Sequence, residues 1–152
     1  MKSMELKTKE IVEAYTMLGS AKYQKLSDDD KVKVWKISKT LKPIALGYAE
    51  EEKDARQSLM PTETFYEDCK RAAEYEKLLL AKQEPTMKQE EYQKIQEQFV
   101  QYQTTLAKAL KESQERQVTI EFEPISEEAF GKLMASNDWS FEQVGKLEFT
   151  LE

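Results

Sequence analysis

The strongest pattern in the sequence is a long stripe of apolar side chains that ends at residue 110. Its seven members recur mostly at intervals of three or four residues, which places them on one face of an α-helix: Tyr92, Ile95, Phe99, Tyr102, Leu106, Ala109 and Leu110. The other face is almost wholly Gln, Lys, Glu and Thr. A helix with one apolar face must cover it, so the pattern predicts a domain of packed helices.

Two helices are expected near the start of the chain. Thr8 can cap a first helix that ends at Gly19, because glycine readily adopts the left-handed conformation that ends a helix. Ser27, followed by three aspartates, is typical of a helix N-terminus, and the second helix should begin there. Pro43 interrupts the second helix, so we expect a kink or a break near Lys42.

A third helix is expected between residues 62 and 82. Thr62 is its candidate cap, and its inward side chains should be Phe65, Cys69, Ala72, Ala73, Leu79 and Leu80. Thr86 and Gln89 have the spacing of a capping box for the helix with the long stripe. Because the links between the second, third and fourth helices are short, we expect an antiparallel hairpin extended into a three-helix layer.

The pattern changes after residue 117. Apolar and polar residues alternate through Val118, Ile120 and Phe122, which predicts a half-buried strand, and Ser126 can cap a short helix after it. Residues 140–151 allow two alternatives. A capping-box pattern at Ser140 and Gln143 favours a final helix, whereas an alternation favours a strand: Leu147, Phe149 and Leu151. We prefer the strand and keep the helix open.

These elements predict a mainly α fold. Residues 1–116 should form the helical region, and residues 117–152 a small C-terminal α+β unit of two short strands and a helix. The smaller unit should pack on the larger one, giving a single domain overall, which suits a length of 152 residues.

Several function classes are disfavoured by what the chain lacks. It has no histidine, which removes the commonest general base and nearly every ordinary catalytic zinc site, so we expect no catalytic residue, no metal and no cofactor. One cysteine and no secretory signal favour the cytoplasm. No apolar run approaches the roughly 20 residues of a membrane span, so we expect no membrane partner.

The segment from Lys31 to Lys42 is the sharpest functional hint. On a helical projection, Lys31, Lys39 and Lys42 lie roughly opposite the apolar stripe of the second helix, and Trp35 falls among them. An aromatic ring flanked by ammonium groups is an arrangement used on single-stranded nucleic acid. The alternative, which we favour, is that the first helix covers Trp35 while the lysine stems pack around it.

Two further residues have structural and functional interpretations. Glu76 lies inside the apolar stripe of the third helix and could be a desolvated acid, but we favour a structural role in which it accepts a hydrogen bond from Tyr48. Cys69 could be a reactive thiol, but burial as a small apolar side chain is the favoured interpretation.

Residues 4–11, the helical hairpin and residues 125–151 together resemble small uncharacterised helical proteins encoded by phages and prophages. The resemblance lies in element order and dispersed apolar positions, and it transfers no site residues. It implies a phage or prophage origin, a bacterial host cell, and a role in particle assembly or in managing the host.

The sequence therefore favours a non-enzymatic interaction or assembly protein that acts through amphipathic helices. Its partner should be a second copy or another protein, bound through Ile95, Phe99 and Leu106 of the long stripe. The alternative is a nucleic-acid or nucleoprotein accessory that uses a basic helix face: Lys31, Trp35, Lys39 and Lys42. An enzyme is the third and least favoured hypothesis.

Overall fold

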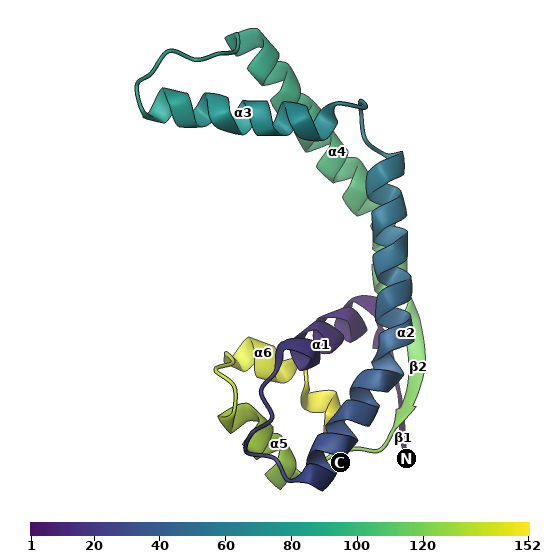
Figure 1. Ribbon diagram of the computed structural model, residues 1–152. Coiled ribbons are helices and arrows are strands. Elements are labelled where there is room, and N and C mark those ends of the chain that lie inside the picture. Colours follow the sequence, from purple (N-terminus) through teal and green to yellow (C-terminus); the bar gives the residue numbers. More distant parts are fainter. The chain divides into compact units, whose positions relative to one another are not determined.

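The computed structural model describes residues 1–152 and is mainly helical, with six α-helices and one small antiparallel sheet (Figure 1). The expected mainly α fold class is confirmed. The elements in chain order are β1 (Lys2–Lys7), α1 (Thr8–Ser20), α2 (Asp28–Ser58), α3 (Phe65–Leu80), α4 (Gln89–Glu115), β2 (Gln117–Phe122), α5 (Glu127–Ala135), α6 (Phe141–Gly145) and a 3₁₀ helix (Glu148–Thr150).

The chain forms two compact units. The first contains Met1–Glu50 and Glu112–Glu152, and the second contains Glu51–Lys111. This division differs from the expected one at residues 116 and 117, because both ends of the chain contribute to the first unit. None of the helices combines the length and the apolarity that crossing a membrane requires.

The sheet of the first unit joins the two ends of the chain. β1 pairs antiparallel with β2, in a register that runs from Lys2 opposite Phe122 to Lys7 opposite Gln117. β1 was not expected from the sequence. Thr8 follows it directly and is the first residue of α1 rather than its cap, because its backbone N–H and its hydroxyl both donate to the Arg116 carbonyl, each at 2.9 Å.

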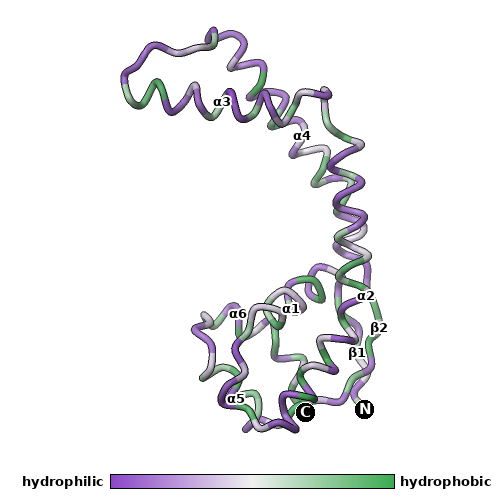
Figure 2. The backbone as a smooth tube through the Cα atoms, viewed as in Figure 1, coloured by the Kyte–Doolittle hydropathy of each residue, from purple (hydrophilic) through white to green (hydrophobic).

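One apolar core fills the first unit, with contributions from α1, α2, β2 and the C-terminal segments. Its least exposed large side chains are Ile11, Val34, Ile37, Leu41, Ile125, Leu133 and Leu147. Hydrophobic and hydrophilic stretches alternate along α2, as expected of a helix with one covered face (Figure 2). α2 is unbroken at Pro43, so the expected break is wrong. Burial of Leu41 and Ala45 on either side offsets the hydrogen bond that proline removes.

The C-terminal strand preferred from the sequence is also wrong. Residues 148–150 form a 3₁₀ helix, and only a single parallel bridge joins Ile125 to Leu151. The capping box at Ser140 and Gln143 is confirmed and begins α6, so the helical alternative holds for residues 141–145. The apolar alternation here has no neighbouring strand to pair with, and Leu147 is buried in the core instead.

The second unit is an antiparallel hairpin of α3 and α4. Phe65 at the start of α3 packs on Tyr102, with ring centroids 4.8 Å apart, while Tyr75 further along α3 stacks on Tyr92 near the start of α4 at 4.4 Å. Both helices begin two residues later than caps at Thr62 and Thr86 predict, at Phe65 and Gln89, so neither threonine caps them.

Near the C-terminal end of α3, the residues that are buried differ from those expected. Tyr75 is buried, whereas three residues expected inward are exposed: Ala73, Leu79 and Leu80. The covered face turns toward Tyr75 because α4 supplies Tyr92 and Ile95 on that side. Sequence spacing alone does not show from which side a neighbouring helix approaches.

Candidate partner-binding site around Trp35

Trp35 is exposed, contrary to the expectation that the first helix covers it. Its side chain is 59% accessible, although Val34 beside it is buried. Successive residues of an α-helix point about 100° apart, so the face of α2 that carries Val34, Ile37 and Leu41 into the core leaves Trp35 at its edge. α1 packs onto that inward face and does not reach over the indole.

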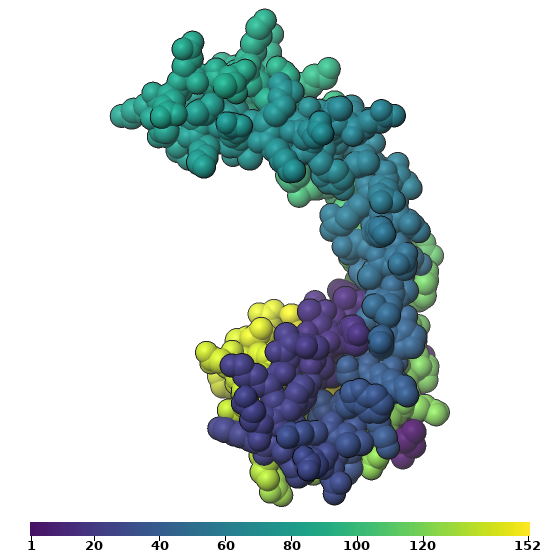
Figure 3. All heavy atoms as spheres, viewed as in Figure 1, coloured from purple at the N-terminus to yellow at the C-terminus, as the bar shows by residue number.

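The indole forms one wall of a hollow of about 320 Å³, here named the Trp35 hollow. The end of α1, the loop after it and one face of α2 supply its lining: Leu18, Gly19, Tyr23, Lys31, Trp35 and Ser38. The same segments, in purple and blue, form much of the visible face of the first unit in Figure 3. The Tyr23 hydroxyl donates to the Leu18 carbonyl, which holds its ring against the end of α1. Burial raises the pKa of Tyr23, so it stays a neutral wall of the hollow.

Lysines surround the indole unevenly. The Lys39 Nζ lies 5.2 Å from the centroid of the Trp35 ring, a cation–π distance. Lys31 lines the hollow, and its Nζ is 3.8 Å from Asp28 Oδ1. Lys42 is exposed but does not line the hollow. The structure therefore brings Lys31, Trp35 and Lys39 together and leaves Lys42 outside.

The residues expected to mediate association through the long stripe are mostly used inside the second unit. Ile95 and Leu106 are buried against α3 and its flanking segments. Phe99 is 37% exposed and lines a groove of about 260 Å³, while its ring stacks on Phe65 with centroids 6.5 Å apart. Of the three, only Phe99 exposes a substantial part of its side chain to solvent.

Glu76 is exposed and has a different partner from the expected one. Its Oε1 accepts hydrogen bonds from the Tyr92 hydroxyl and, at 3.3 Å, from Gln96 Nε2. The hydrogen bond to Glu76 raises the pKa of Tyr92. Tyr48 belongs to the first unit and instead accepts from Gln114 Nε2 at 2.8 Å. The hydrogen bonds that Glu76 accepts therefore come from α4, whereas the sequence predicted one from Tyr48.

Cys69 is half-buried in α3 rather than fully covered. Partial burial raises the pKa of its thiol, and the negative charge of the neighbouring Asp68 carboxylate raises it further. A raised pKa keeps the thiol protonated near neutral pH, so the side chain is a poor nucleophile there. This agrees with its interpretation as a packing residue.

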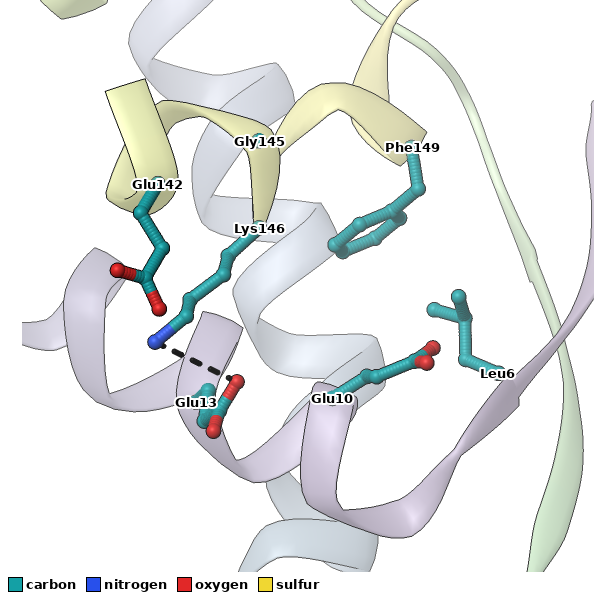
Figure 4. A pocket seen from close by; sticks show the side chains of 7 residues that line it. All are labelled: Leu6, Glu10, Glu13, Glu142, Gly145, Lys146 and Phe149. Atoms are coloured by element: carbon teal, nitrogen blue, oxygen red, sulfur yellow. Dashed lines mark ion pairs between the residues drawn. The ribbon is translucent and has the colours of Figure 1, made fainter. Parts of the chain in front are cut away.

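A second hollow in the first unit has an acidic lining that the sequence analysis missed. It measures about 360 Å³, and Figure 4 shows Glu13 and Glu142 beside the ammonium group of Lys146, while the Glu10 carboxylate points toward Leu6. Lys146 Nζ is 3.6 Å from Glu13 Oε2, and Glu10 accepts a hydrogen bond from the Lys7 backbone that caps α1. These carboxylates come from segments more than 120 residues apart, so no local pattern could reveal them. No cluster of acidic or cysteine side chains in the chain has the geometry to hold a metal ion.

Comparison with protein-family models, with curated proteins and with solved structures finds no match for this chain.

Proposed function

We propose that this chain is a non-enzymatic interaction protein and that the Trp35 hollow binds a segment of a protein partner. One observation carries the proposal: an indole that is 59% exposed forms one wall of a mostly apolar hollow in the first unit. Trp and Tyr are enriched among the residues that dominate binding energy at protein interfaces. Trp35 and Tyr23 supply one of each to the same hollow.

The lining and the charges favour an acidic segment with an apolar or aromatic side chain. Leu18 and Tyr23 offer apolar surface to such a side chain, and Lys31 and Lys39 stand beside the indole. Seven lysines and only three aspartates lie between residues 18 and 42, although the whole chain has a net charge of −6. A locally basic surface on an acidic protein attracts acidic partners and orients them.

A nucleic-acid accessory is the second candidate, and the exposure of Trp35 is the observation that favours it. A base could stack on the indole while Lys31, Lys39 and Lys42 contact phosphates. The net charge of −6 weighs against it, because it repels a long polyanion more strongly than a short acidic peptide segment.

A phage or prophage origin and a bacterial cytoplasmic location belong to the same proposal. They rest on the resemblance of residues 4–11 and 125–151 and on the single cysteine. A gene neighbourhood with portal, capsid or tail genes would support the origin. A neighbourhood of metabolic genes only would count against it.

Trp35 fluorescence tests both candidates in one assay. In a Trp139→Phe background Trp35 is the only indole, since the chain has two tryptophans. An acidic peptide with a central phenylalanine should shift its emission to shorter wavelength, with a dissociation constant of about 1 mM or lower. The same peptide with serine in place of phenylalanine should have no effect.

A single-stranded oligonucleotide is the third probe in this assay. Quenching by the oligonucleotide that weakens steeply with salt would favour the nucleic-acid function instead. Trp35 emission that responds to neither peptide nor oligonucleotide would refute the Trp35 hollow as a binding site.

A further inference from the structure

We propose that the Trp35 hollow binds the Phe141 side chain of a second copy of this chain, so that the protein associates with itself through this contact. The inference rests on the proposed function and names its partner. Two features of the first unit carry it: an isolated exposed ring at Phe141, and opposite charges around the ring and the hollow.

Phe141 is unusually exposed to solvent for a large apolar residue. Its side chain is 98% exposed, the highest fraction among the large apolar residues of the chain. Nearby Trp139, Val144 and Phe149 all pack against the core of the first unit, but Phe141 does not. An exposed phenylalanine contributes nothing to folding, whereas at an interface it buries a large apolar surface.

The backbone around Phe141 is held in place. Phe141 is the first residue of α6, and the capping box of this helix flanks it. Gln143 N–H donates to Ser140 Oγ at 3.3 Å, and Ser140 N–H donates to Gln143 Oε1 at 2.9 Å. A ring presented from an ordered turn loses less conformational entropy on binding than one on a loose terminus.

The charges around Phe141 complement those of the Trp35 hollow. Residues 121–152 contain eight acidic residues and two lysines, and Asp138 and Glu142 flank the ring closely in sequence. Lys31 lines the hollow and Lys39 lies against its indole. Inserting Phe141 into the hollow of another copy would bring Asp138 and Glu142 toward Lys31 and Lys39. The segment around Phe141 therefore has both properties proposed for the partner, an aromatic side chain and acidic neighbours.

Each copy carries both the ring and the hollow. Two copies can therefore exchange rings around a two-fold axis and close a dimer, or copies can associate head to tail. Both arrangements use the same contact, and both predict that losing either side of it reduces association.

Molar mass from light scattering across a dilution series gives the first test. The wild type should associate, and Phe141→Ser or Trp35→Ser should each move the midpoint of association at least about tenfold to higher concentration. Leu80→Ser is the matched control, because Leu80 is 86% exposed but lies in α3 of the second unit. It should associate like the wild type, and circular dichroism should show the same helix content for every variant.

Three results of this test would overturn the inference. One is a wild type that stays monomeric up to about 1 mM. Another is a folded Phe141→Ser protein that associates like the wild type. The third is a Leu80→Ser protein that loses association as strongly as Phe141→Ser does.

The second test mixes two variants that lack opposite sides of the contact. Both carry Trp139→Phe, so the Phe141→Ser copy keeps Trp35 as the only indole in the mixture. Adding the Trp35→Ser copy, which keeps Phe141, should shift Trp35 emission to shorter wavelength and give a one-to-one complex. A copy with both Trp35→Ser and Phe141→Ser should cause no shift.

The outcomes separate this inference from the proposed function. If the hollow binds the acidic phenylalanine peptide but not the Phe141-bearing copy, the second-copy inference fails and the proposed function stands. If it binds neither, both fail.

Discussion

Replacing Trp35 by alanine should destabilise the first unit only modestly, because most of the indole is already in water. The matched comparison is Ile37→Ala. Ile37 lies two residues along in α2 but is only 1% exposed and belongs to the core. The two substitutions therefore change the same helix, one at its exposed edge and one at its buried face.

The structure sets the size of both effects. About two fifths of the Trp35 side chain is covered, which is about 100 Å² of a large aromatic residue and about 2.5 kcal/mol at 25 cal/mol per Å². Loss of the exposed cation–π contact with Lys39 adds about 0.5 kcal/mol to this cost, and the higher helix propensity of alanine lowers the cost by a similar amount. Allowing for residual burial in the unfolded chain, Trp35→Ala should cost about 2 kcal/mol. Ile37→Ala should cost 2 to 5 kcal/mol and more than Trp35→Ala, because it leaves a cavity in a closed core.

Urea unfolding measures both free energies. Circular dichroism reports helix loss, and Trp139, which packs against the core of the first unit, reports that unit by fluorescence in both variants. Linear extrapolation at equal slope gives the difference in unfolding free energy. A cost for Trp35→Ala of about 3 kcal/mol or more, equal to or above that of Ile37→Ala, would show that the indole is buried. It would also remove the exposed ring on which the proposed function depends.

Two further outcomes follow from particular contacts. Hydrogen bonds from Lys7 and Lys9 lower the pKa of Glu115 from 4.5 to about 2, so the contribution of this carboxylate to stability is full above pH 4.5 and lost as the pH falls through 2. Glu115→Gln should therefore show a shallower fall in melting temperature than the wild type across that window, and parallel curves would contradict the assignment. Phe99→Asp should lower the unfolding free energy by about 1 to 3 kcal/mol, because the ring stacks on Phe65, without changing the concentration dependence of molar mass. A folded, fully stable Phe99→Asp protein that no longer associates would instead restore the long stripe as the association surface.

Local patterns predicted several elements because their signals lie within a few residues. Ser27 and Ser126 accept hydrogen bonds from backbone N–H groups three residues on, at 3.2 and 3.1 Å, as expected of helix caps. The alternation of residues 118–122 gave strand β2, and the long stripe gave helix α4. A cap needs only its own first turn, and an apolar stripe needs only the period of its own helix.

Strand β1 could not be predicted from local sequence because its partner strand is distant in the sequence. Its hydrogen bonds go to residues 117–122, and a six-residue segment with weak alternation gives little evidence of pairing by itself. The C-terminal segment shows the converse. Its apolar and polar residues alternate as in a strand, but only one bridge forms, because no neighbouring strand is present to form further backbone hydrogen bonds with it.

By itself the sequence determined the mainly helical class, the position of its long helices, and the presence of one tryptophan among lysines. Only the tertiary structure decided which of these side chains meet solvent. Trp35 is exposed because α1 packs on the neighbouring face of α2, and Ile95 and Leu106 are buried because α3 and the segments around it pack against α4. Periodicity fixes the faces of a helix, but the face that stays open depends on where the other helices pack, and those contacts join residues distant in sequence.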